Sequence, residues 1–429
     1  MRRATALWAL LLAASTVAGC GADAEPRRQA PAAKEQSGTQ AGSAEAGAGA
    51  GASPAADPDA PTGWGPTVGE LDQARALVET MTAEQRVATV LMPGFWGYDG
   101  EDPTPAEVAQ NQRMYELDTP VDVVETHGFS GFFLRPEVIA DADQVARLTA
   151  QLHTAGDGPD GLPLLLSMDQ EGGVVQRLKE GVDVVPSAAA VGASNDTAYA
   201  RKVARRNGRT LRDLGLTMVL APVADVDPDG VSVMGSRSYS RDVDVAAEMV
   251  AASVEGYLRA GVVPVVKHFP GLGTVRGDSH RSLPVQSKSV EQLLRTDLVP
   301  FRAAIEAGAP AVMSAHVAVN DLEKDMPASL SRAVLQGLLR DRLGFEGVVI
   351  TDSQGMGPIH GRYGPAEGAV RSLLAGNDLV LNSYLPEKAR TAVLRALESG
   401  RLGEDRVVEA ATRVTALRIY QQRLASAAG

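Results

Sequence analysis

Eight short apolar runs, separated by stretches of helical pattern, constrain the fold of this 429-residue chain more than any other feature. Most of the runs are continuously apolar, which is typical of parallel strands buried on both faces. Eight strand–helix pairs predict an α/β fold, specifically a (β/α)8 TIM barrel. A doubly wound parallel sheet is the alternative that the same pattern allows. The runs lie at residues 87–95, 129–135, 162–170, 216–226, 262–269, 311–317, 347–353 and 378–384.

The helical stretches between these runs carry recognisable stop signals. Residues 244–261 and 289–308 are both amphipathic and both end in glycine, the residue most common just after a helix. We therefore predict one helix in each of these two stretches. Residues 387–425 are also expected to be helical and to pack on the outside of the barrel.

The N-terminal residues have the pattern of an export signal. Two arginines precede an apolar stretch, residues 7–17, that is too short to span a bilayer. The stretch ends in the letters VAGC, which resemble a bacterial lipobox with Cys20 as the lipidated residue. We predict a lipoprotein signal peptide at residues 1–19 and a lipid anchor on Cys20 that places a secreted protein at the extracellular face of the cell membrane. A plain signal peptide followed by a chance cysteine is the alternative.

The composition changes after the cysteine. Residues 21–62 consist mainly of Ala, Gly, Ser, Pro, Glu and Gln, so they cannot bury enough apolar surface to fold. We predict that residues 20–65 form a flexible linker and that residues 66–429 form a single folded domain. Cys20 is the only cysteine, which excludes an intrachain disulfide.

The bulk composition excludes some partners. The formal net charge is −12, whereas binding to nucleic acid needs a basic surface, so no nucleic-acid partner is expected. Apolar residues at 44% and charged residues at 22% are ordinary for a soluble globular domain. Aromatic residues at 4% leave no room for a large aromatic binding surface.

Polar residues collect where the predicted strands end, and in a TIM barrel the active site lies at the carboxyl ends of the strands. A polar residue at one strand end can simply cap a loop, but the same pattern at several ends predicts a site. The residues concerned are Asp169, Gln170, Glu171, Asp225, Lys267, His268, His316 and Asp352.

Asp352 follows directly on the buried run GVVIT. A carboxylate in this position can attack an electrophilic carbon or hold a metal ion. The alternative is a turn or helix cap, which aspartate often supplies. The sequence context favours a catalytic carboxylate.

Asp278 and His280 are two residues apart in a glycine-rich segment, KHFPGLGTVRGDSH. At this spacing a carboxylate can orient the imidazole and stabilise its cation, and the imidazole can then move protons near neutral pH. The glycines allow the loop to move over a bound substrate. The alternative is a solvated surface loop.

Two segments resemble cofactor-binding or metal-binding motifs but lack a residue that each motif requires. GLGTVRG differs from a dinucleotide-binding loop because Arg276 stands at the position of the third glycine. DVDPDG, at residues 225–230, differs from a calcium loop because Ser236 occupies the twelfth position. The chain also has no HExxH motif and no Cys/His cluster. We therefore expect neither a metal nor a cofactor.

Three motifs carry a resemblance to a known family. DQEGGVVQRL (169–178), KHFPGLGTVRGDSH (267–280) and GVVITDSQGM (347–356) resemble glycoside hydrolase family 3, and in particular its bacterial β-N-acetylglucosaminidases, or β-hexosaminidases. Weaker matches lie between them in the family's order, so the resemblance covers about residues 75–385.

The resemblance implies a retaining glycosidase. Asp352 matches the family's nucleophile, and His280, paired with Asp278, matches its acid/base. The implied activity is removal of terminal, non-reducing β-linked GlcNAc from peptidoglycan fragments or, as a rival, chitin oligosaccharides. The family needs no metal, and we expect a monomer. The positions that match substrate-binding residues are Asp169, Arg177, Arg237, Lys267 and His268.

Two positions depart from the family pattern. Leu272 replaces the second histidine of KHFPGHG, and Ser353 replaces the aspartate that usually follows the nucleophile. Neither departure removes a residue with an assigned role, but Leu272 is expected to loosen or reshape the loop, which bears on rate or substrate choice. The alternatives are therefore a β-glucosidase or glycoside phosphorylase of the same family, or a lipoprotein that binds sugar with little catalysis.

Overall fold

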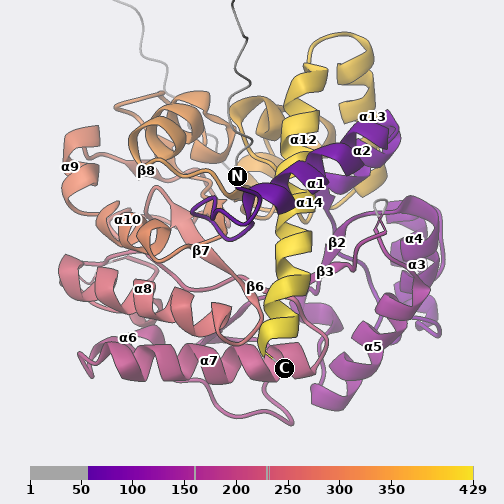
Figure 1. The fold of residues 1–429 in the computed structure, drawn as a ribbon. Helices are drawn as coiled ribbons and strands as arrows, with labels where there is room; N and C mark the ends of the chain where they lie inside the picture. The colour runs from indigo at the N-terminus through magenta and orange to yellow at the C-terminus, as the bar shows by residue number, and fades with distance from the viewer. Residues whose placement is uncertain (1–56, 159–160, 229, 231, 429) are drawn as a thin grey trace, which may run out of the picture. The chain divides into compact units, whose positions relative to one another are not determined.

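The computed structural model describes residues 57–158, 161–228, 230 and 232–428. The predicted signal peptide, Cys20 and most of the predicted linker lie outside the described residues. Within the described part, the structure is an α/β fold built on a curled parallel sheet (Figure 1).

Six parallel strands form the main sheet in the order β11-β9-β7-β6-β3-β2, and β1 pairs in parallel with β12. Each of these strands lies inside a predicted apolar run. The order follows the chain without the reversal that defines a doubly wound sheet. The strands are β1 (Leu91–Met92), β2 (Gly131–Phe133), β3 (Leu165–Met168), β6 (Met218–Val219), β7 (Val263–Phe269), β9 (Ala311–Ser314), β11 (Val348–Thr351) and β12 (Val380–Leu381).

Backbone hydrogen bonds continue beyond the ends of the main sheet. The N–H of Phe133 in β2 donates to the carbonyl of Pro93, just after β1, at 2.8 Å. The N–H of Thr351 in β11 donates to the carbonyl of Leu379, just before β12, at 2.9 Å. The β1–β12 pair is therefore bonded to both edges of the main sheet, and the sheet curls as a result.

Both faces of the sheet are buried, as continuous apolar runs require. Successive residues of a strand point to opposite faces. In β7, Val265 belongs to a cluster with Met313 and Ile350 on the inner face. Its neighbour Val266 belongs to a second cluster with residues of the surrounding helices, including Phe301.

Four short strands were not predicted. The strands β4 (Gln170–Gly172) and β5 (Val175–Gln176) form an antiparallel hairpin directly after β3. The strands β8 (Val285–Gln286) and β10 (Ala318–Val319) pair in parallel outside the main sheet. Each of them is too short to give a periodic signal in the sequence.

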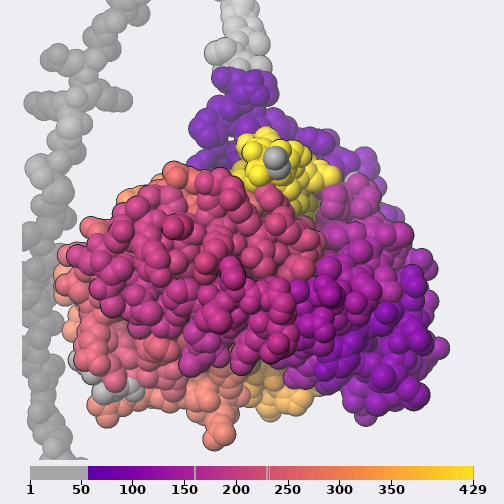
Figure 2. Space-filling model, turned by 90° about the horizontal axis from the view of Figure 1, so that it is seen from below, coloured from indigo at the N-terminus to yellow at the C-terminus, as the bar shows by residue number. Residues whose placement is uncertain are grey.

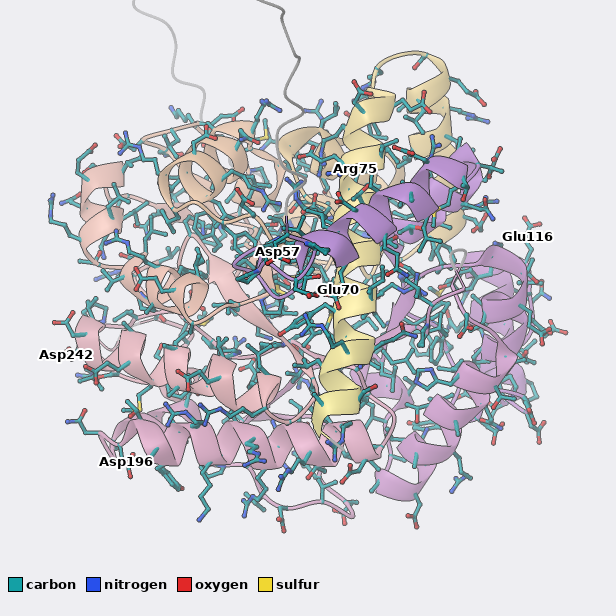
Figure 3. The ribbon with its side chains drawn as sticks, in the orientation of Figure 1. Asp57, Glu70, Arg75, Glu116, Asp196 and Asp242 are labelled. Carbon is teal, nitrogen blue, oxygen red and sulfur yellow. The ribbon has the colours of Figure 1, made fainter. Side chains whose placement is uncertain are left out.

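Helices surround the sheet, and most begin at a side-chain cap. Asp196 and Asp242, labelled in Figure 3, accept backbone hydrogen bonds at the N-termini of α7 and α8, which pack side by side (Figure 1). The helices are α1 (Val68–Thr80), α2 (Ala83–Thr89), α3 (Pro105–Tyr115), α4 (Pro120–His127), α5 (Ala142–Ala155), α6 (Ala188–Gly192), α7 (Thr197–Asp213), α8 (Val243–Leu258), α9 (Val290–Arg295), α10 (Val299–Glu306), α11 (Gly357–His360), α12 (Gly364–Ala375), α13 (Pro386–Glu398) and α14 (Glu404–Ala428), the 3-10 turns η1 (Pro136–Val138), η2 (Gly235–Arg237) and η3 (Ala328–Leu330), and the π-helix η4 (Ala333–Arg342).

The prediction of a single helix over residues 289–308 was wrong, because two helices, α9 and α10, occupy this stretch. Pro300 lies in the first turn of α10, where its missing N–H costs no helical hydrogen bond, and it disfavours a helix that runs through it. Between the helices, the buried side chain of Asp297 bonds to the loop after β7. The stop signals were right, since Gly261 and Gly308 both have positive φ.

The C-terminal helix lies against the first residues of the described part. Helix α14 packs on α1, and Figure 2 shows the C-terminal residues in yellow next to the indigo N-terminal ones. Arg423 pairs with Glu70, labelled in Figure 3, at 2.6 Å. Trp64, which was assigned to the linker, is only 4% exposed and shares a cluster with Tyr420. The folded domain therefore begins before residue 66. Over the described ranges, no helix combines the length and apolar character needed to cross a membrane.

Candidate active site

A cavity of about 730 Å³ opens at the carboxyl ends of the strands. All eight residues that the sequence assigned to catalysis or sugar binding line it, so the strand ends and loops do bring them together. They are Asp169, Arg177, Arg237, Lys267, His268, Asp278, His280 and Asp352.

Two cations and two carboxylates form a network at one side of the cavity. Lys267 Nζ, at the end of β7, lies 2.7 Å from Asp169 Oδ1 and 2.7 Å from Glu171 Oε1. Arg237 donates to both oxygens of Glu171 at 2.8 Å. A buried charge is tolerated only when it is paired and hydrogen-bonded, and here each carboxylate contacts at least one cation.

The network keeps its members charged. Burial acts to raise the pKa of Glu171, but Lys267 and Arg237 together lower that pKa to about 2. Burial also acts to lower the pKa of Lys267, while Asp169 and Glu171 raise it above its ordinary value. The site therefore presents fixed donors and acceptors at neutral pH, and such groups can hold the hydroxyls and the acetamido group of a sugar.

Asp225 links a sugar-binding candidate to the loop after β7. His268 Nδ1 donates to Asp225 Oδ2 at 2.7 Å, and the N–H of Leu272 donates to Asp225 Oδ1 at 2.6 Å. Arg237 Nη2 donates to His268 Nε2 at 3.4 Å. One buried carboxylate thus fixes the His268 ring and the start of the loop together.

Asp352 follows β11 and is held by its backbone. Its N–H donates to the carbonyl of Ser314 at 2.9 Å, and its Oδ1 accepts from the N–H of Ser353 at 2.8 Å. Burial acts to raise the pKa of Asp352, but His316, His268, the N–H of Ser353 and Lys267 lower it below its ordinary value. Among the described residues Asp352 has no ion pair, so an ionised carboxylate faces the cavity.

His316 lies behind Asp352 and is fully buried. Its Nε2 donates to the carbonyl of Ser353 at 2.9 Å, and its Nδ1 lies 2.7 Å from Ser329 Oγ. Burial lowers the pKa of His316 below its ordinary value, and the nearby Asp352 acts against this shift.

His280 and Asp278 form a pair at the mouth of the cavity. His280 Nδ1 lies 2.8 Å from Asp278 Oδ1, and the His280 side chain is 69% exposed. The N–H and the ring of His280 lower the pKa of Asp278 below its ordinary value. Because Nδ1 donates to the carboxylate, Nε2 is left to exchange protons with a bound molecule.

A second group of polar residues holds the base of the loop. Asp297 is 1% exposed and accepts from Thr274 Oγ1 at 2.8 Å and from Lys288 Nζ at 2.5 Å. Gln286 Nε2 donates to Thr274 Oγ1 at 3.0 Å. At the far end of the loop, the N–H of Gly357 donates to the carbonyl of His280 at 3.1 Å. The loop is thus bonded to the rest of the protein at both ends.

The roles of several residues in and around the cavity were missed from the sequence. Glu171 stands inside the motif DQEGG, but only the structure reveals its contacts with Lys267 and Arg237. Asp225 was singled out as a strand-end residue without a role. Tyr384 and His360 carry no sequence signal, because single aromatic residues in loops follow no pattern.

The two departures from the family pattern both have partners. Leu272 is 4% exposed and belongs to the cluster that contains Val275 and Phe269. Ser353 Oγ accepts from Asn382 Nδ2 at 2.9 Å. The leucine therefore anchors the loop by apolar packing. Of the residues that the structure describes, none form a group of three or more His, Cys, Asp or Glu placed to hold a metal ion.

The fold and the site define a class of protein. Residues 83–417 match the model of the glycosyl hydrolase family 3 N terminal domain, and the chain belongs to this family.

The chain is similar in sequence to two beta-hexosaminidases. The chain is 39% identical over 259 residues to the beta-hexosaminidase LpqI of Mycobacterium tuberculosis (strain ATCC 25618 / H37Rv), a match that covers 58% of this chain and 65% of LpqI. It is 36% identical over 266 residues to a beta-hexosaminidase of Stenotrophomonas maltophilia (strain K279a), covering 61% of this chain and 78% of that protein.

A similar solved structure is a glycoside hydrolase family 3 beta-N-acetylglucosaminidase from Paenibacillus sp. str. FPU-7, with a TM-score of 0.73 and 38% identity. That match covers 80% of this chain and 63% of the Paenibacillus chain. The chain thus spans less than two thirds of the length of both this enzyme and LpqI.

Proposed function

We propose that this protein is a retaining exo-β-N-acetylglucosaminidase that removes terminal, non-reducing β-linked GlcNAc. One observation carries the proposal: the ionised Asp352 and the His280–Asp278 pair line the same cavity as the charged sugar-binding candidates. Membership of glycosyl hydrolase family 3 and the beta-hexosaminidase relatives support it. We further propose that the eight parallel strands close into a (β/α)8 barrel, with the β1–β12 pair completing the circle.

In the first half of the reaction, an oxygen of Asp352 attacks the anomeric carbon and the glycosidic C–O bond breaks. His280 gives its Nε2 proton to the leaving oxygen, and a covalent glycosyl-enzyme forms. In the second half, His280 takes a proton from water, the water oxygen attacks the anomeric carbon, and Asp352 leaves as a carboxylate. Asp278 orients the imidazole and stabilises its cation in each half.

Sugar binding falls to the charged residues on the other side of the cavity. Lys267 and Asp169, 2.7 Å apart, offer a donor and an acceptor to neighbouring hydroxyls. Arg237 and His268 lie next to them, and Arg177 is exposed beside the β4–β5 hairpin. A site that hydrogen-bonds a specific substituent rejects analogues that lack it.

The natural substrate in this proposal is a peptidoglycan fragment in which GlcNAc is linked to an acidic muramyl sugar. Arg135 supports this choice, because it lines the cavity and its guanidinium lies 4.3 Å from the Trp96 ring centroid and 3.4 Å from the exposed Glu137 carboxylate. A cation held in this way can bind the carboxylate of an acidic aglycone. Chitin oligosaccharides, which have no carboxylate, are the rival substrates.

The location in this proposal is the extracellular face of the cell membrane. In this proposal the signal peptide is residues 1–19, and a lipid on Cys20 and the linker hold a single catalytic domain, residues 66–429, away from the membrane. Because Trp64 is buried in this domain, the domain begins slightly before residue 66. The monomeric state remains a prediction.

The experiment that tests the proposal is hydrolysis of a chromogenic β-GlcNAc glycoside by residues 57–429. The Asp352→Ala variant should have no turnover, while Asp143→Ala, at an exposed position on α5, should match the wild type. Full activity in Asp352→Ala contradicts the proposal. Turnover that requires phosphate points to a phosphorylase, preference for glucosides points to a β-glucosidase, and GlcNAc binding without turnover points to a binding lipoprotein.

A further inference from the structure

Two aromatic rings line the cavity on the side that the sugar-binding candidates leave free. Those candidates come from the ends of β3 and β7, from the turn η2 and from the β4–β5 hairpin, whereas His360 ends α11 and Tyr384 follows β12. The strand order places β11 and β12 away from β3 and β6, with Asp352 at the end of β11. Asp352 therefore separates the charged half of the cavity from the half with the rings.

The rings also lie beside the loop that carries His280. The N–H of Gly357, the first residue of α11, donates to the carbonyl of His280 at 3.1 Å. A Cβ at this glycine would meet the carbonyl oxygens of Arg281 at 2.7 Å and His280 at 3.0 Å, so the contact is as close as a glycine permits. Helix α11 is one turn long, so His360 lies within a turn of this contact.

The contacts of His360 and Tyr384 do not show a role for these two rings in stabilising the fold. The centroids of His360 and Tyr384 are 4.0 Å apart and the ring planes are inclined at 50°. Within the described residues, neither side chain forms a hydrogen bond or belongs to a hydrophobic cluster. Tyr384 is half-buried and His360 is exposed, so the pair presents aromatic surface to the cavity and to solvent.

We propose that Tyr384 is the platform on which the aglycone sugar stacks, and that His360 is a positioning residue that holds the Tyr384 ring in place. The inference rests on the proposed function, because the aglycone is the sugar whose oxygen receives the proton from His280. Its ligand is a pyranose ring, whose C–H groups carry positive partial charge and face the negative surface of an aromatic ring. The 50° inclination means that a single sugar can lie flat on only one of the two rings.

The test compares two substrates with the same GlcNAc and different leaving groups. In β-GlcNAc fluoride the leaving group is a single atom and needs no platform, whereas in chitobiose it is a second sugar. Tyr384→Ala should lower kcat/KM for chitobiose roughly tenfold or more, and leave kcat/KM for the fluoride within about twofold. Tyr384→Phe should keep both values, because stacking uses the ring and not the hydroxyl. His360→Ala should lower only the chitobiose value, by a smaller factor.

The matched control is Tyr199→Ala on α7, another partly exposed tyrosine that does not line the cavity. Equal losses on both substrates in Tyr384→Ala would mean that the ring supports the fold, and unchanged kinetics on both would mean that it has no role. Either result overturns the platform while the wild type still cleaves the fluoride. A wild type that cleaves neither substrate overturns the proposed function, and the platform with it.

Discussion

His280 Nδ1 lies 2.8 Å from Asp278 Oδ1, on a side chain that is 69% exposed at the mouth of the cavity. The two residues are only two positions apart in the sequence and lie on the same loop, so the carboxylate can orient the ring without help from a distant element. The acid/base role proposed for His280 differs from the pair of carboxylates that most retaining glycosidases use. The dependence of the proposed His280 activity on Asp278 can be tested directly.

Replacing Asp278 with asparagine should reduce kcat more than it changes KM, because the amide cannot stabilise the imidazole cation that forms during the reaction.

Loss of His280 itself, as His280→Ala, should lower kcat/KM by roughly a hundredfold or more on unactivated substrates. A dinitrophenyl glycoside, whose leaving group needs little protonation, should restore much of the rate of the first step. An equal loss on both leaving groups would show that His280 does not act as the acid.

Protonation of Glu171 should destabilise the fold in acid. The pKa of this carboxyl is lowered to about 2 from its ordinary value of 4.5, so its stabilising effect is complete above 4.5 and is lost as the pH falls toward 2. The loss should reach about 3 kcal/mol in the free energy of unfolding. Urea unfolding of the wild type between pH 2 and 6 measures this effect. In Glu171→Gln the same pH range should give a flatter profile, and an unchanged slope would contradict the assignment.

Loss of the buried anchor under the loop should affect catalysis at a distance. Asp297→Asn removes the charge that pairs with Lys288 at 2.5 Å and weakens the bond from Thr274. Because the proposed sugar-binding residues are untouched, we expect kcat to fall while the affinity for GlcNAc changes little. Steady-state kinetics and GlcNAc binding measured side by side separate the two effects. Glu291→Gln, whose ion pair with Arg342 is exposed and 3.9 Å long, is the control.

Restoring the family histidine at position 272 should lower stability. Leu272 is 4% exposed among apolar side chains, and an imidazole placed there loses water without gaining an assured partner. We expect Leu272→His to cost about 1–3 kcal/mol in the free energy of unfolding. Leu272→Met, which conserves the volume, should cost much less. A histidine variant as stable as the wild type would show that the loop can repack around a polar side chain.

The charge of Arg135 should matter only for acidic substrates. Arg135→Gln should lower kcat/KM for a GlcNAc–muramyl disaccharide and leave chitobiose unchanged, because only the muramyl sugar carries a carboxylate. Parallel digestion of the two substrates measures the ratio. A ratio that stays the same in the variant would contradict the proposed role and favour chitin oligosaccharides as the substrates.

The strands could be predicted because each is buried on both faces, and this leaves a continuous apolar run in the sequence. The site could be located because charged residues such as Asp352 follow those runs, and parallel strands bring their ends to one edge. What each charge contacts could not be predicted. Glu171 meets Arg237 across 66 positions of chain, and His268 meets Asp225 across 43. Contacts of this kind depend on where the loops lie in space.

Short elements escaped prediction for a related reason. A two-residue strand such as β5 or β8 has no period to detect, and whether it pairs depends on a neighbour far along the chain. The break between α9 and α10 did leave a sign in Pro300, but amphipathic character on both sides of it suggested one helix. The Trp64 side chain was assigned to the linker because its burial depends on α14, at the other end of the domain.

The hydrogen bond from Gly357 to the carbonyl of His280 limits the distance between the proposed acid, His280, and the proposed nucleophile, Asp352. Asp352 is five residues before Gly357 on one continuous segment, so Asp352 and His280 are connected by a short span of backbone and a single hydrogen bond. A hinge motion of the glycine-rich loop that keeps this bond leaves their separation nearly constant. A motion that breaks it would move His280 away from Asp352, and the proposed nucleophile would then lack the proposed proton donor.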